Sequence, residues 1–91
     1  MARAIKLHPK DNVVVCIEPV KKGDIVSYAG GSTKASEDIP IGHKMAIEHI
    51  EMGETVVKYG EIIGIASSEI EVGRHVHIHN VTSLRFRRRC R

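Results

Sequence analysis

The amino-acid sequence predicts a small, mostly β domain built from short strands and pseudo-duplicated turns. Its apolar runs are short and rich in valine and isoleucine, which favour strands, and signals for helices are poor. One glycine-containing pattern recurs four times along the chain. Two tyrosines, one phenylalanine and no tryptophan leave the core to aliphatic side chains. With 91 residues, the chain is expected to form one domain with a thin core.

The repeated pattern places an apolar residue three positions before a glycine and another three positions after it. Its four copies centre on Gly23, Gly42, Gly53 and Gly73. A glycine at a fixed offset predicts a turn in which φ is positive or the backbone is crowded. Because the separations within the first and the second pair are nearly equal, we expect two similar halves. Chance recurrence is the alternative.

The strands are placed by apolar runs between these turns, and 12–17 is the most continuous, as expected of a strand buried on both faces. Tyr59-Gly60 is predicted to be a tight reversal and 29–34 a small-residue loop. Residues 44–51 could instead hold a turn of helix. The expected strands span 4–8, 12–17, 24–28, 44–47, 54–58, 61–66 and 74–79.

The distribution of charge divides the chain into a domain over 1–81 and a basic tail over 82–91. Five arginines in the last seven residues supply more than the net charge of +3. We expect this tail to be disordered or to contact a partner, and nucleic-acid binding is disfavoured because no recognised module accompanies it. Cys16 lies in the apolar run and is expected to be reduced, with a disulfide to Cys90 as the weaker alternative. No secretory signal or membrane span is evident, so a cytoplasmic protein is expected.

Three histidines alternate with apolar residues in the segment 73–80. If 74–79 is a strand, Val76 and Ile78 face the core and His75, His77 and His79 form a row on the opposite face. Imidazole suits metal ligation, acid–base chemistry and anion recognition, although a solvated strand face is the alternative. Same-face neighbours lie about 6.5–7 Å apart, so two ligands from this row with others from elsewhere are favoured over three.

Two further groups of polar side chains stand beside glycine turns. His43 and Lys44 follow Gly42, and Lys58 and Tyr59 precede Gly60. Ammonium and imidazolium groups attract a carboxylate, and a phenol bonds a hydroxyl group, so this set suits a small polyhydroxy acid. Solvated surface side chains are the alternative. The sequence contains no nucleophile elbow, phosphate-binding loop or dinucleotide fingerprint, so a complete enzyme site within this chain is not expected.

The ordered motifs resemble those of one known enzyme family. The segments 7–13, 40–46, 53–64 and 73–80 are similar to the N-terminal domain of the altronate and galactarate dehydratases. A similar domain is the small subunit of sulfolactate sulfo-lyase. The resemblance implies an SAF-type domain with the β-clip fold. The family's large catalytic region is absent from this sequence, so the chain is expected to be either a separately encoded small subunit that needs a large catalytic subunit for activity, or a fragment.

The resemblance also implies a reaction and a set of site residues. The family eliminates water or sulfite from hydroxy acids and commonly depends on a divalent metal, for which iron or manganese is expected in the full complex. The hypothesis assigns His77 and His79 as metal ligands. The alternatives are a stand-alone sugar-acid or anion-binding module and a sulfo-lyase small subunit, and a homo-oligomer is also compatible. The residues expected to bind a sugar-acid substrate are His43, Lys44, Lys58, Tyr59, His77, His79 and Asn80.

Overall fold

The computed structural model describes residues 2–83 and consists of short strands, with no helix in that part of the chain. This confirms the predicted mostly β class. Accordingly, no helix among residues 2–83 is long and apolar enough to cross a membrane. The strands are β1 (Ala2–Ile5), β2 (Val13–Cys16), β3 (Ile25–Tyr28), β4 (Gly31–Lys34), β5 (Lys44–Ala46), β6 (Thr55–Lys58), β7 (Glu61–Ala66), β8 (His75–Val76) and β9 (Val81–Ser83).

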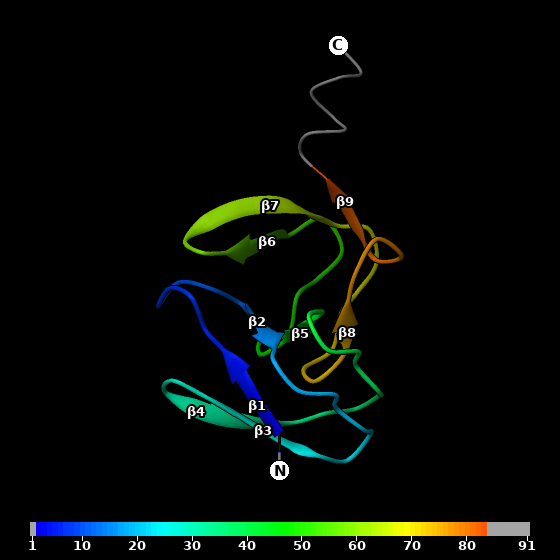
Figure 1. Cartoon of the computed structure of the whole chain (residues 1–91). Coiled ribbons are helices and arrows are strands. Elements are labelled where there is room, and N and C mark those ends of the chain that lie inside the picture. The colour runs from blue at the N-terminus through cyan, green and yellow to red at the C-terminus, as the bar shows by residue number, and fades with distance from the viewer. Residues whose placement is uncertain (1, 84–91) are drawn as a thin grey trace.

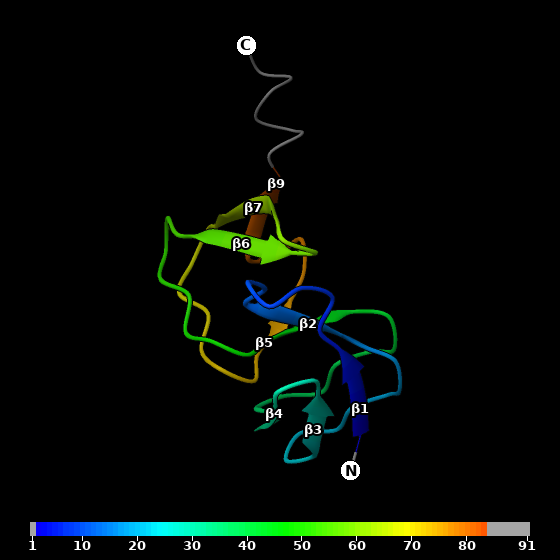
Figure 2. The same ribbon diagram turned by 90° about the vertical axis from the view of Figure 1, so that its left-hand side faces the viewer.

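The strands form two sheets that lie at opposite ends of the domain and meet at its centre (Figures 1 and 2). The larger sheet has the order β4-β3-β1-β2-β5-β8, and the smaller has the order β6-β7-β9. Most neighbours are antiparallel, and β1 pairs with β3 in parallel. The strands β2 and β5 occupy the middle, between the β3–β4 hairpin and the β6–β7 hairpin (Figure 2).

The four repeated turns have one conformation, which confirms the prediction from the glycine pattern. The glycines at 23, 42, 53 and 73 have φ angles of 93°, 85°, 92° and 89°. In each turn the residue after the glycine donates its backbone N–H to the carbonyl of the residue two positions before the glycine. The buried residues that open the turns pair as two bridges, Val20 with Ile39 and Ile50 with Ile70. Each bridge closes one half of the domain, as expected of two similar halves.

The core is divided into two aliphatic clusters, one in each half. Val14, Cys16 and Met45 belong to the first cluster, whereas Val13 and Ala46 belong to the second. Because side chains alternate across a strand, β2 and β5 supply both clusters from opposite faces. This confirms that the central run is buried on both sides. Full burial of one valine or methionine contributes about 1.5–3 kcal/mol, so these two strands stabilise both halves of the domain.

The predicted strand over 74–79 is wrong after Val76, because β8 ends at that residue and a turn follows. Val76 is fully buried as predicted, but Ile78 is 84% exposed instead of facing the core. The turn is closed by Asn80, whose Oδ1 accepts the backbone N–H of His77 at 2.9 Å. Its Nδ2 donates to the carbonyl of His75 at 2.8 Å. A side chain that binds the backbone of the same segment competes with strand pairing.

The predicted loop over 29–34 is also wrong, because Gly31–Lys34 is the strand β4 of a hairpin with β3. Polar residues occupy this strand, and their pairing is supported by a 2.6 Å hydrogen bond between the hydroxyls of Tyr28 and Thr33. The helical alternative for 44–51 is wrong as well, because Lys44–Ala46 is β5. The strand Val81–Ser83 was not predicted.

Several expectations concern the basic tail, whose residues from 84 onward lie outside the described part of the chain. Cys16 is buried and free, in agreement with the expected reduced core residue. Cys90 and the five terminal arginines belong to the undescribed segment. The domain boundary at 81 and the role of the tail therefore stay predictions.

Candidate functional site

Three imidazoles from two adjacent strands converge at one edge of the larger sheet. His43 lies just before β5, and His75 begins β8. The antiparallel register pairs Lys44 with Val76 and Met45 with His75, so the next step brings His43 beside His77. The rings of His43 and His77 are stacked, with centroids 4.4 Å apart. Strand pairing therefore gathers side chains that are separated by a long stretch of sequence.

The imidazole cluster, defined as His43, His75 and His77, has closely spaced nitrogens. Nδ1 of His43 lies 2.8 Å from Nε2 of His75, so one of these nitrogens donates a hydrogen bond to the other. Each of the three residues offers one nitrogen, and these three nitrogens lie within 4.8 Å of one another. The rings of His75 and His77 are nearly parallel, with centroids 5.4 Å apart. All three side chains are partly exposed, so the cluster is open to a ligand from solvent.

The surroundings of His75 and His77 disfavour protonation of these two imidazoles. Burial lowers the pKa of His75, and the neighbouring imidazoles of His43, His79 and His77 lower it further, while Glu37 opposes the shift. The pKa of His77 is lowered by desolvation, then by His43, Lys44 and His79. Neutral imidazole is the form that binds a metal ion or acts as a base.

His79 and Asn80 have different positions from those expected of an unbroken strand. The His79 ring lies 5.3 Å from that of His75, centroid to centroid, but its side chain is exposed and outside the imidazole cluster. Asn80 is buried, and its amide binds the backbone of His75 and His77. Asn80 thus fixes the turn that presents His77.

Lys44 links the imidazole cluster to the smaller sheet. Its side chain is half-buried, and its pKa is lowered first by this burial and then by the nearby charge of Lys58. It lines a hollow of about 190 Å³ together with His77 and three aliphatic side chains, Ile63, Ile78 and Val81. One ammonium group and an imidazole beside an apolar wall, with the charge of Lys58 nearby, form a suitable surface for a small anion with a carbon chain.

The reversal at Tyr59-Gly60 is confirmed, and both residues have positive φ, 60° and 74°. Tyr59 is 69% exposed, so its phenol points to solvent at the tip of the β6–β7 hairpin. Gly60 has no room for a side chain, because a Cβ there would lie 2.8 Å from the His8 ring. The turn is thereby fixed against the segment that precedes β2.

Two acidic residues that organise the site were not predicted as parts of it. Asp11 is buried, and its Oδ1 accepts the backbone N–H of Gly60 at 2.8 Å. Glu37 accepts the backbone N–H of His75 at 2.8 Å and forms an ion pair with Arg74, whose Nε lies 3.2 Å from the Glu37 carboxylate. Both contacts join residues that are distant in sequence. The only signal for Asp11 was its place before a buried strand, where a side-chain-to-backbone bond was expected.

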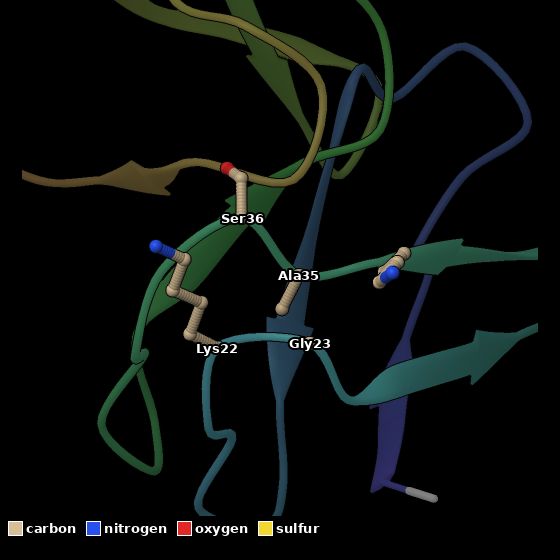
Figure 3. Close-up of a pocket in the computed structure, with 5 residues that line it drawn as sticks. Lys22, Gly23, Ala35 and Ser36 are labelled. Carbon is tan, nitrogen blue, oxygen red and sulfur yellow. The ribbon is translucent and has the colours of Figure 1, made fainter.

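Other candidate sites lie away from the imidazole cluster. A hollow of about 520 Å³ lies between the first repeated turn and the end of β4 (Figure 3). Its polar side chains are those of exposed residues, Lys22, Lys34 and Ser36, so no buried polar group defines a ligand there. His49, Glu69 and Glu71 form a second group with closely spaced donor atoms, but all three are exposed. The imidazole cluster combines partial burial with convergence and is the better candidate.

These observations define a class: a small all-β module with paired turns, two half-cores and a cationic, imidazole-rich edge. The chain belongs to the Altronate/galactarate dehydratase SAF domain family, which matches residues 2–84. This confirms the resemblance and the SAF-type fold predicted from the motifs.

The curated relatives are of two kinds. The chain is 40% identical over 80 residues to the altronate dehydratase of Bacillus subtilis (strain 168), covering 88% of this chain and 16% of that protein. It is 41% identical over 76 residues to the altronate dehydratase of Escherichia coli (strain K12), covering 84% and 15%. It is 50% identical over 52 residues to the (2R)-sulfolactate sulfo-lyase subunit alpha of Paracoccus pantotrophus, covering 57% and 78%. The chain therefore spans about a sixth of the dehydratases that it matches.

Proposed function

We propose that this chain is the SAF-domain subunit of a sugar-acid dehydratase-type lyase and contributes substrate-binding residues to a large catalytic subunit in the cytoplasm. The observation that carries the proposal is the cationic edge formed by Lys44 and Lys58, with the imidazole of His77 and a hollow beside Lys44. The relatives supply the reaction class, because two of them are altronate dehydratases in which this domain is a small part. Most of such an enzyme would then be provided by another chain.

The cationic edge has the chemistry to hold a sugar acid by its carboxylate. Lys44 is half-buried, so its ammonium group meets an anion with less competition from water than an exposed lysine does. Lys58 adds a second positive charge nearby. In this proposal the phenol of Tyr59 and the exposed imidazole of His79 would bind the substrate hydroxyl groups. In this proposal Asn80 acts by positioning His77, because its amide is already bonded to the backbone.

Elimination requires charge stabilisation at two places on the substrate. A base removes the proton α to the carboxylate, and the hydroxyl group on the β carbon leaves with assistance from an acid. Negative charge grows on the carboxylate side as the proton departs, and Lys44 and Lys58 are placed to stabilise it. A divalent metal ion, iron or manganese in the sequence hypothesis, would supply Lewis-acid assistance to the leaving group when bound.

The experiment is to recover the chain with its partner from native extract, purify the complex and assay dehydration of altronate and galactarate. We expect an inert chain and an active complex. Lys44→Ala should raise KM by about 10-fold or more, because a hydrogen bond to a charged group contributes about 1.5–3 kcal/mol. Lys21→Ala, at an exposed lysine in the first turn, is the matched control and should leave KM unchanged. Failure to recover or reconstitute any active complex would refute the proposal.

A second candidate, a sulfo-lyase small subunit, is favoured by one specific comparison. The aligned segment covers 78% of the sulfolactate sulfo-lyase subunit alpha of Paracoccus pantotrophus, so it makes up most of that subunit. Release of sulfite from sulfolactate by the same complex would select this candidate over a hydro-lyase. Calorimetry with the isolated chain tests the stand-alone binder, because tight binding of an aldonic or aldaric acid without a partner would favour that alternative.

A further inference from the structure

The imidazole cluster has the composition of a metal centre, whatever partner the chain has. His43 is supplied by the turn before β5, whereas His75 and His77 come from β8 and the turn after it. The backbone holds all three positions: the β5–β8 pairing places His43 and His75, and Asn80 fixes the turn at His77. A ligand would therefore meet nitrogens that are already gathered, which reduces the entropy that binding must overcome.

The spacing of the nitrogens fits a single ion. Metal–imidazole bonds of about 2.0–2.1 Å place the nitrogens of a tetrahedral site about 3.3 Å apart. The observed separations start at 2.8 Å for His43 and His75 and stay within 4.8 Å for the whole cluster. Small rotations of the side chains would bring all three to one centre. An ion would also replace the hydrogen bond that the two closest nitrogens now share.

The donor set selects the kind of ion. Three imidazoles suit zinc, iron(II), cobalt(II), nickel(II) and copper(II), whereas manganese and magnesium prefer oxygen ligands. Three protein ligands leave at least one coordination position open, as in catalytic rather than structural sites. The partial exposure of the cluster gives that position to solvent or substrate. Lys44 and the hollow beside His77 lie next to it.

We propose that His43, His75 and His77 form a three-histidine site for a late first-row divalent transition metal, with an open position beside Lys44. This assignment keeps His77 from the sequence hypothesis and places His43 and His75, not His79, with it. The inference goes beyond the proposed function because the site needs no residue from a partner subunit. Metal binding by the chain can thus succeed or fail independently of dehydratase activity.

The first test is calorimetry of Zn²⁺ and Co²⁺ binding to the full 91-residue chain, with the visible absorption of bound Co²⁺ as a second readout. We expect one ion per chain and weaker binding of Mn²⁺. His43→Ala, His75→Ala and His77→Ala should each weaken affinity by about 100-fold or more, since even an outer-shell partner contributes 10–100-fold. His79→Ala and His49→Ala are the matched controls and should bind as the wild type does. Wild-type affinity in His43→Ala, or loss of binding in either control, would overturn the site.

A second test uses the unaltered chain, in case a variant does not fold. Histidine-selective NMR of the wild type should show that one equivalent of Zn²⁺ changes the ring nitrogen signals of His43, His75 and His77 together. The signals of His49 should stay unchanged. The proposal would be overturned if the ring nitrogen signals of His43, His75 and His77 showed no saturable change with Zn²⁺. It would also be overturned if only the signals of His49 changed. Metal binding without activity in the partner complex would leave this inference standing and count against the proposed function alone.

Discussion

The Oδ1 atom of Asp11 lies 2.8 Å from the backbone nitrogen of Gly60, 49 residues further along the chain. This contact joins the tip of the β6–β7 hairpin to the segment before β2, next to the bonds that Asn12 makes to Thr55 and Val57. Lys58 and Tyr59 stand at that tip, so the buried carboxylate helps to position two predicted substrate-binding residues. Asp11 is 1% exposed, so the backbone N–H of Gly60 rather than water stabilises its charge at Oδ1.

Asp11→Ala should lower the free energy of unfolding by about 1.5–3 kcal/mol, the range for hydrogen bonds to a charged group. Urea denaturation at neutral pH measures this change. Asp11→Asn keeps an oxygen acceptor of the same shape and should lose less. Equal stability of the alanine variant and the wild type would contradict the anchoring role.

The same carboxyl predicts a pH dependence at acid pH. Burial favours the neutral acid, but hydrogen bonds from the backbone of Gly60, Tyr59 and His8 outweigh it and hold the pKa of Asp11 below its ordinary value. A lowered folded-state pKa stabilises the protein above the unfolded-state pKa, and this contribution is lost as pH falls through the folded-state pKa. The difference in stability between wild type and Asp11→Asn should therefore shrink as the solution is acidified. A difference that is constant with pH would exclude ionisation of Asp11 as the cause.

The fold was predictable where the sequence signal is local. A positive-φ glycine is required within each turn, so the four glycines revealed the turns and the two halves. The strand over 61–66 was placed correctly because six consecutive residues alternate or are apolar between clear turns. By contrast, β4 consists of Gly31-Ser-Thr-Lys34, which has no apolar pattern and is a strand only because β3 lies beside it.

The candidate site was predictable in composition but not in arrangement. The histidine row indicated a site, and the expectation that two of its members combine with a ligand from elsewhere agrees with the cluster that includes His43. Which two members converge depended on where β8 ends. That end is set by the bonds of Asn80 to its own segment, which strand periodicity does not describe. The contact of His43 with His75 spans 32 residues and depends on the β5–β8 register.

Asn80→Ala should destabilise the domain by about 1–3 kcal/mol, because it removes two side-chain bonds to buried or half-buried backbone groups. It should also release the turn after β8, so that the amide and ring signals of His77 shift in NMR spectra. Asn80→Asp retains the oxygen that accepts the His77 N–H but loses the donor to His75, and an intermediate effect is expected. An unchanged His77 signal in the alanine variant would show that another contact sets the turn.

Cys16 should be an unreactive thiol in the folded protein. The residue is fully buried, and this burial raises the pKa of its thiol to about 11. The thiolate is the reactive form, so at neutral pH both access and ionisation oppose reaction. In a Cys90→Ser background, a thiol-specific disulfide reagent should react slowly under native conditions and rapidly in urea. A fast reaction without denaturant would mean that β2 opens readily.

His49 should titrate above the ordinary range for histidine. Its Nε2 lies 2.7 Å from Oε2 of Glu69, and this hydrogen bond is the main reason that the pKa of His49 is raised. The nearby carboxylates of Glu71 and Glu51 act in the same direction. A raised folded-state pKa stabilises the protein in full below the unfolded-state pKa, and this contribution disappears as pH rises through the folded-state pKa. Because the pair is exposed, the effect on stability is expected to be small and reduced by salt.

An NMR titration of the His49 ring measures its pKa directly and so tests the contact with Glu69. Glu69→Gln should move the titration midpoint of His49 down toward the ordinary value, because the glutamine side chain carries no charge. Glu48→Gln is the matched control, since Glu48 is also exposed but is not among the groups that raise the pKa of His49. An equal shift in both variants would assign the effect to the general negative charge of this surface rather than to the contact with Glu69.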